Sequence, residues 1–340
     1  MTPARLRPPS SERRLLALGA GLLALLLAVV LGTFVGARGV MPGDVVAILL
    51  GRGDGADAVV ILTQRLPRTL VGALVGVALG AAGALMQGHT RNALADPGLF
   101  GVNAGAAFGV VMLTYLFGVR DLVAIGVASL LGALVTSALV MLAGIGARRG
   151  TSPVTLAVVG VTVSAMLASA TGVVVLLDSD SLDVMRFWQV GSISGGAYSE
   201  ALLMVAVLGV GLVLAGINAV GLNALALGDE VAAAQGTSLR AVRVVGLAAI
   251  AVLCGGATAI AGPIAFVGLV VPHAARLLVG PDHRWLVPLS GLLGGVLLLV
   301  ADVVGRLSVG GTRFPVGVSM AMVGVPLLLA LVGRRRLVSL

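Results

Sequence analysis

Nine long stretches without a charged residue constrain this chain more than any other feature of its sequence. Counting Arg, Asp and Glu as charged, they cover residues 15–37, 69–90, 97–119, 122–147, 150–177, 201–228, 244–275, 285–301 and 314–333. A helix needs about 20 mostly apolar residues to cross the hydrocarbon core of a bilayer. Only 11% of the chain is charged, whereas soluble domains carry about 25% charged residues. The pattern predicts an all-α polytopic membrane protein and excludes a soluble enzyme, a disordered chain and a secreted disulfide scaffold.

One stretch is too long for a single span. Residues 244–275 number 32, with Gly262 and Pro263 near the middle. Proline removes a helix hydrogen bond and clashes with the preceding turn, and glycine tolerates the resulting bend. Dividing the stretch there predicts about ten transmembrane helices. The second piece then continues past Arg276, whose long side chain can extend toward the interface.

The arginines set the predicted orientation. All 22 basic residues are Arg, and ten spans put 14 of them on the side of the N-terminus and 8 on the other. The positive-inside rule then predicts that both termini are cytoplasmic. The predicted organisation is a tail at 1–14, a ten-helix membrane domain at 15–333 and a second tail at 334–340. The net charge of +8 follows from this topology, and with 3% aromatic residues the chain offers no surface for nucleic acid.

Glycines recur four residues apart within two of the predicted helices. They lie at Gly72, Gly76 and Gly80, and again at Gly101, Gly105 and Gly109. Small residues at this spacing let helix backbones approach each other closely in lipid. We therefore expect a tightly packed bundle.

Motifs for catalysis are absent from the sequence. It has no phosphate-binding G-x-x-x-x-G-K-[ST], no lysine, no H-E-x-x-H, no G-x-S-x-G and no paired carboxylates within a span. Three scattered histidines and the single Cys254 predict neither a metal site nor a disulfide. The protein is therefore not expected to be an enzyme or to bind a cofactor, and uphill transport would need energy from another subunit. A secondary transporter driven by an ion gradient stays the alternative, although its usual acids within the spans are missing.

Three predicted loops have sequence features that a simple connector between helices would not need. Arg65 and Arg68 precede the second predicted helix on the outer side, and 89–98 is a polar, turn-rich connector on the inner side. Residues 222–236, also inside, predict short amphipathic helical turns closed by glycine. The arginine pair could serve as an interfacial anchor, and 222–236 could lie on lipid. The acidic Asp229 and Glu230 favour a protein partner for that segment over an anionic lipid surface.

The sequence resembles the permease subunit of type II ABC importers for iron-siderophores, haem and vitamin B12. The resemblance extends over nearly the whole chain from about residue 60, and it rests on the order and spacing of several segments. They are RLPRTLVGALVG (65–76), GALMQG (83–88), RNALADPGLFGVNAGA (91–106), WQVGSISGG (188–196), LNALALGDEVAAAQG (222–236), AGPIAFVGLVVPHAARLLVGPDHR (261–284), ADVVGR (301–306) and FPVGVSMAMVGVPLLLALV (314–332).

The resemblance implies a multi-pass protein of the cell membrane with a defined set of partners. A second permease copy or a paralogue would complete the translocation pathway, a homodimer in the first case. Two cytoplasmic ABC ATPase subunits would bind ATP and Mg²⁺ and drive transport. An extracytoplasmic binding protein would deliver the metal chelate. A ferric siderophore is the expected substrate, with haem and cobalamin as alternatives.

The resemblance also assigns roles to individual residues. Arg65, Arg68 and Arg306 match arginines that dock the binding protein, and Asn92 and Leu94 match a cytoplasmic gate. Within a coupling segment at 219–240, the residues expected to contact the ATPase are Leu222, Asn223, Leu225, Leu227, Gly228, Asp229, Glu230, Ala232 and Gly236. The residues expected to line the pathway are Thr162, Ser164, Ser169 and Thr171.

Four further positions carry expectations of their own. Ala93 stands where the family usually has Pro, which predicts a less rigid gate loop. Arg313 stands where the family usually has Glu, which changes the charge on the outer face. His273 is expected to be packed and hydrogen-bonded, and Trp188 is expected to be an interfacial aromatic residue.

Overall fold

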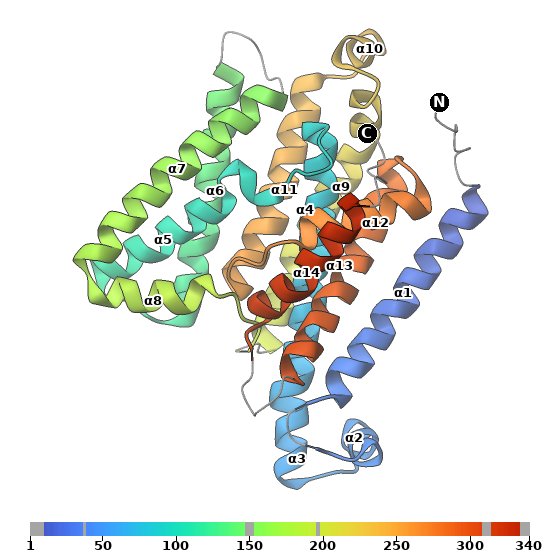
Figure 1. Cartoon of the computed structure of the whole chain (residues 1–340), viewed down its shortest axis with the longest axis vertical. Helices are drawn as coiled ribbons and strands as arrows, with labels where there is room; N and C mark the ends of the chain where they lie inside the picture. The colour runs from blue at the N-terminus through green and yellow to red at the C-terminus, as the bar shows by residue number, and fades with distance from the viewer. Residues whose placement is uncertain (1–9, 37–38, 147–152, 195–197, 308–313, 334–340) are drawn as a thin grey trace.

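The computed structural model describes residues 10–36, 39–146, 153–194, 198–307 and 314–333, and within these ranges it contains helices and no strands (Figure 1). The long helices are α1 (Ser11–Phe34), α4 (Leu66–Thr90), α5 (Val102–Phe117), α6 (Leu122–Gly146), α7 (Pro153–Leu177), α9 (Tyr198–Leu225), α11 (Leu239–Ala261), α12 (Val267–Val279), α13 (His283–Arg306) and α14 (Val316–Gly333). The short ones are α2 (Pro42–Leu49), α3 (Gly55–Val59), the π-helical η1 (Val60–Arg65), the 3-10 helix η2 (Pro97–Phe100), α8 (Ser179–Gln189) and α10 (Asp229–Ala234).

Seven helical segments in the described ranges are long and apolar enough to cross a membrane. They are α1, the continuous stretch from α3 through η1 to the end of α4, α6, α7, α9, α11 and α13. The helices α5, α12 and α14 are apolar but shorter, and they occupy the positions of the other three predicted spans. The all-α membrane architecture is thus confirmed, whereas the count of ten and the side of the termini stay predictions.

The predicted break at Gly262 and Pro263 is confirmed. Helix α11 ends at Ala261 and α12 begins at Val267, and the residues between them are not helical. Gly262 has φ of 69°, which glycine adopts without steric cost. Phe266, the residue before α12, has φ of 71°, a region that bulky side chains rarely occupy. Two residues with positive φ, one after α11 and one before α12, therefore separate the two helices.

Helix α4 is the centre of the molecule, with contacts to α13, α11, α9 and α12. Its predicted glycine row packs directly on the backbone of α13. A Cβ atom at Gly76 would lie 2.5 Å from the Gly294 carbonyl oxygen, and one at Gly80 would lie 2.1 Å from the Ser290 carbonyl oxygen. On the α12 side, a Cβ at Gly83 would lie 2.1 Å from the Gly268 carbonyl oxygen. The expected close packing is confirmed, since no side chain fits at these positions.

A second group of helices lies beside this centre, coloured green to cyan in Figure 1. Helix α5 contacts α6, α7 and α8, and α11 joins the group to α4 and α9. Gly105 and Gly109 of α5 meet the backbone of α6 at Gly132 and Ala128. Helix α8 lies between two of the predicted spans, 150–177 and 201–228. The Asp178 carboxylate starts this helix by accepting a hydrogen bond from the Ser181 backbone N–H at 2.8 Å.

Charged side chains gather at the two ends of the bundle. One end brings together the starts of α1, α11 and α13 with α10, and the other brings together the end of α1, η1 and the end of α13 (Figure 1). Several arginines that fixed the predicted orientation lie outside the described residues. They are Arg5, Arg7, Arg38, Arg148, Arg149, Arg313 and Arg334–Arg336.

Candidate functional site

The last turn of α1 is held by two of the three arginines expected to dock a binding protein. Carbonyl groups at a helix C-terminus lack intrahelical partners and carry partial negative charge. Arg306 Nη1 donates to the Gly32 carbonyl at 2.7 Å, and Arg65 Nη1 donates to the Phe34 carbonyl at 3.0 Å. These bonds join α1 to η1 and to α13.

Asp302 links the third arginine to the same cluster. Its Oδ1 accepts from Arg68 Nη2 at 2.6 Å, and its Oδ2 accepts from Arg306 Nε at 2.8 Å. The carboxylate is fully buried, and the side chain of Arg68 is 13% exposed. Arg65 and Arg306 are buried too. The sequence placed all three arginines outside but did not show that a buried carboxylate in α13 already pairs with two of them.

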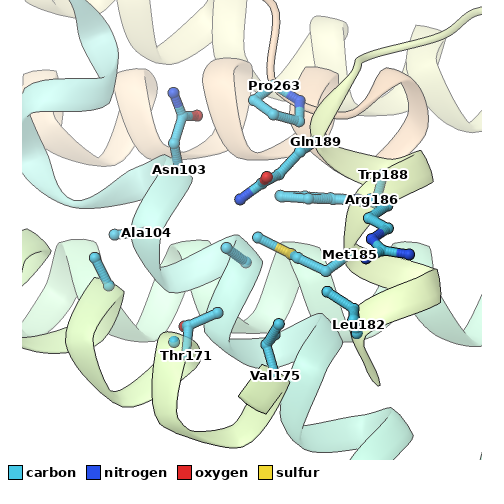
Figure 2. Close-up of a pocket in the computed structure, with 13 residues that line it drawn as sticks. Asn103, Ala104, Thr171, Val175, Leu182, Met185, Arg186, Trp188, Gln189 and Pro263 are labelled. Carbon is cyan, nitrogen blue, oxygen red and sulfur yellow. The ribbon is translucent and has the colours of Figure 1, made fainter. Parts of the chain in front are cut away.

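A cavity of about 390 Å³ opens between α5, α7 and α8, beside Pro263 (Figure 2). Asn103 comes from α5, Thr171 from α7, and Arg186, Trp188 and Gln189 from α8. Among the described residues that line it there is no carboxylate. The Thr171 hydroxyl and the Trp188 indole nitrogen are buried without a hydrogen-bond partner. The cavity therefore offers a cation and several hydrogen-bond donors to a ligand rich in oxygen acceptors.

The four residues expected to line a pathway differ in whether they line this cavity. Thr171 lines the cavity. Thr162, Ser164 and Ser169 do not, and their hydroxyls donate to carbonyls one turn earlier in α7, at 2.9, 2.7 and 2.9 Å. Their role stays a prediction. Trp188 lines the cavity with its indole nitrogen buried, because α8 packs on α5, and its position at the membrane interface stays a prediction.

The connector after α4 forms a closed turn. The Asn92 side-chain oxygen accepts from the Leu94 backbone N–H at 2.9 Å, and the Asn92 carbonyl accepts from the Ala95 N–H at 3.1 Å. Leu94 is 49% exposed. The Asn92 side chain thus stabilises the turn, because its oxygen accepts a hydrogen bond as a backbone carbonyl would. Both hydrogen bonds are present with Ala93 at the position where the family pattern has proline.

The first part of the expected coupling segment, 219–240, belongs to α9, which extends to Leu225. Leu222 and Leu225 are buried in the core at 1% and 3% exposure, so they are not available to a partner. Leu227 and Val231 are 62% and 45% exposed, while Ala232 is buried. Of the predicted contact residues, Leu227 is therefore accessible to a partner, whereas Leu222, Leu225 and Ala232 are not. Val231 is an exposed apolar residue that the sequence did not single out.

Glycines set the bounds of α10. Gly228 and Gly236 have φ of 108° and 81°, values that glycine adopts without the steric cost of a Cβ atom. Glu230 lies exposed in the first turn of α10.

Asp229, the first residue of α10, holds this element to the rest of the bundle. Its Oδ1 lies 2.5 Å from Arg91 Nη2, and its Oδ2 lies 2.5 Å from Arg243 Nη2. Burial opposes the charge on Asp229, but the two guanidinium groups outweigh burial and hold the pKa of this carboxyl below its ordinary value. Arg91 immediately precedes the turn at Asn92, so the ion pair between Arg91 and Asp229 links that turn to α10. Neither arginine was singled out from the sequence.

Asn223 belongs to a neighbouring network at the same end. Its amide nitrogen donates to Asp282 Oδ1 at 2.6 Å, and its oxygen accepts from the His283 backbone N–H at 2.9 Å. Asp282 also pairs with Arg284, and the hydrogen bonds from Arg284 lower the pKa of Asp282 to about 2. His273 is buried as expected. Among the described residues, no three His, Cys, Asp or Glu side chains gather as a metal site would require.

Comparison with known proteins identifies the family of this chain. A family model described as the FecCD transport family matches residues 24–334. The chain belongs to the FecCD transport family. It is 43% identical to the ferric enterobactin transport system permease protein FepD of Escherichia coli, over 92% of this chain and 94% of that protein. It is 38% identical to the probable siderophore transport system permease protein YfiZ of Bacillus subtilis, over 79% and 81%.

A solved structure gives the same result for the fold. It is of a metal-chelate type ABC transporter in an inward-facing conformation, with 27% identity and a TM-score of 0.81, and the match covers 93% of this chain and 98% of that one. The resemblance to ABC importer permeases is therefore confirmed. The FecCD chain described here is a transport permease and a multi-pass protein of the cell membrane.

We predict that Asp302 stabilises the fold. Asp302→Asn is expected to lower the free energy of unfolding by about 3–5 kcal/mol, because two guanidinium groups would stay buried without their carboxylate. Denaturant unfolding in detergent measures the change. The matched control is Asp183→Asn, which removes an exposed pair with Arg186 (3.6 Å; 66% and 62% exposed) and should cost no more than about 1 kcal/mol. Equal losses in the two variants would contradict the assignment.

Proposed function

We propose that this permease forms the translocation pathway of an ATP-driven importer for a ferric siderophore. The identity of 43% with a ferric enterobactin permease over nearly the whole of both chains carries the proposal. The cavity at α8 supports it, since a cation, amide groups and unpaired donors suit an anionic chelate rich in oxygen atoms. Haem and cobalamin are the alternative substrates.

Uptake into proteoliposomes tests this function. The chain is reconstituted with its ATPase and binding protein and offered a ferric siderophore labelled with radioactive iron, labelled haem or labelled cobalamin. We expect ATP-dependent accumulation of the siderophore alone. Accumulation of cobalamin or haem instead would overturn the substrate. Accumulation driven by a proton or sodium gradient without ATP would favour the secondary transporter.

Docking of the binding protein is proposed at the cluster of Arg65, Arg68 and Arg306. The three arginines lie together, and the Asp302 carboxylate is shared between two of them, Arg68 and Arg306. Arg68 is the least buried of the three and is the one best placed to meet an acidic side chain of a partner. Partly buried charge pairs of this kind contribute more than exposed ones because solvent screens them less.

Arg68→Gln is expected to weaken capture of the loaded binding protein about tenfold, since one charge-assisted contact is lost while the pair between Arg306 and Asp302 remains. Binding kinetics on importer-containing nanodiscs measure the effect, which should shrink at high salt. Arg52→Gln, at an exposed arginine on the same end of the bundle, is the control and should bind normally. Unchanged capture by Arg68→Gln, with normal ATPase association, would refute docking at this residue.

Coupling to the ATPase subunits is proposed at the surface formed by Leu227, α10 and Gly236. This surface presents exposed Leu227 and Val231 next to Asp229 and Glu230, as expected for a helix that fills a partner's cleft with an acidic rim. The ion pair between Asp229 and Arg91 then connects the surface to the proposed gate turn at Asn92 and Leu94. A second copy of the chain or a paralogue would complete the pathway beside α7.

Leu227→Asp combined with Val231→Asp should abolish co-purification with the ATPase and leave hydrolysis unstimulated by the binding protein, because each apolar side chain contributes about 1.5–3 kcal/mol when buried. The matched control is Leu50→Asp with Val46→Asp in and after α2, at the opposite end. Those residues are 65% and 45% exposed, against 62% and 45% for the test pair. Normal co-purification and uptake in the test variant would mean that α10 lies on lipid.

A further inference from the structure

A groove of about 760 Å³ runs between α1 and α9 on the outside of the bundle. Helix α13 forms its floor, with Val287, Gly291 and Leu292. Leu15 and Leu22 of α1 line one wall, and α9 lines the other. Both flanking helices are candidate spans that are mostly exposed in the chain, at 17% and 33% buried. The groove therefore opens onto the lipid-facing side of two membrane helices, and its walls are apolar.

Glycines widen this groove. Gly19 of α1 and Gly216 of α9 line it, and a Cβ atom at either position would meet nothing within 4 Å. They differ from the glycines of the core, such as Gly80, where a Cβ would collide with a backbone oxygen. Close helix packing does not require glycine at these two positions. Their effect is to leave room for a slender apolar group.

One end of the groove is polar and positively charged. His283 and Arg284, at the start of α13, line it there, and Arg14 reaches the same place from the start of α1. Asp282 pairs with Arg284 at 2.8 Å and with Arg14 at 3.5 Å, so one carboxylate serves two guanidinium groups. The Arg14 Nε has no hydrogen-bond partner, and the Arg284 side chain is 62% exposed.

The neighbouring first turn of α1 adds Arg13 and Glu12, both exposed. At the mouth itself, the Asp282 carboxylate is shared between the guanidinium groups of Arg14 and Arg284. The mouth lies where the first turns of two membrane-spanning helices begin, which is the level of lipid headgroups. By the predicted orientation this is the cytoplasmic leaflet, where anionic lipids attract arginine clusters next to a span.

We propose that the groove binds one anionic glycerophospholipid, with its phosphate near Arg284 and Arg14 and an acyl chain along Gly19 and Gly216. The polarity of the groove matches an amphiphile of that form, with cations at one end and an apolar channel behind them. A helix from a second copy would fill the apolar channel but would not use the arginines. A neutral lipid would likewise leave them without a partner.

Native mass spectrometry of the full chain with added dioleoylphosphatidylglycerol or dioleoylphosphatidylcholine tests the proposal. We expect one retained phosphatidylglycerol and at least tenfold weaker retention of phosphatidylcholine. Gly216→Leu should block the channel and reduce phosphatidylglycerol retention about tenfold. Arg284→Gln should reduce it about fivefold, as expected for one arginine near a charged headgroup.

The matched control is Gly209→Leu, on α9 two turns away. A Cβ at Gly209 also meets nothing within 4 Å, but this residue does not line the groove, so retention should be unchanged. Gly19→Leu repeats the block from α1 if Gly216→Leu fails to fold. Equal retention of both lipids, or normal retention in both blocked variants, would overturn the proposal. Loss of dimer in the blocked variants, with no change in lipid, would assign the groove to a second copy instead.

Discussion

Backbone contact between α4 and its neighbours is the constraint on which the rest of this bundle depends. Lipid tails are as apolar as leucine, so helices in a membrane gain little from burying apolar side chains and associate through close packing. Gly76, Gly80 and Gly83 let α4 touch the backbones of α13 and α12 directly. Helices α9 and α11 then pack around that pair, and α11 joins it to the group of α5, α6, α7 and α8.

The features that the sequence predicted well are those that the physical constraints of a bilayer determine. The length of charge-free stretches located the helices, because an apolar segment of that length has few other stable environments. The break at Gly262 and Pro263 was predictable from backbone chemistry alone. So was the close packing of the glycine row in α4, since the spacing of small residues encodes which face can approach another helix.

The ends of the helices were harder to predict because burial there depends on tertiary contacts. Leu222 and Leu225 fit an amphipathic surface element equally well as the last turn of a buried helix, and the structure places them in α9. Arg65 and Arg306 look like exposed cations in the sequence, yet carbonyl groups of α1 accept their hydrogen bonds. That partnership joins residues more than thirty positions apart, so no local pattern reveals it.

The attachments of α1 have a mechanical consequence. Helices α1 and α13 each contain 24 residues, run parallel, and are joined by Arg14 and Asp282 at their starts and by Arg306 at their ends. Two rods of equal length that are fastened at both ends cannot tilt independently. A change in bilayer thickness, which single helices absorb by tilting, must therefore turn α1 and α13 together. Because α13 is packed against α4, hydrophobic mismatch at the rim of the protein would also act on the helices at its centre.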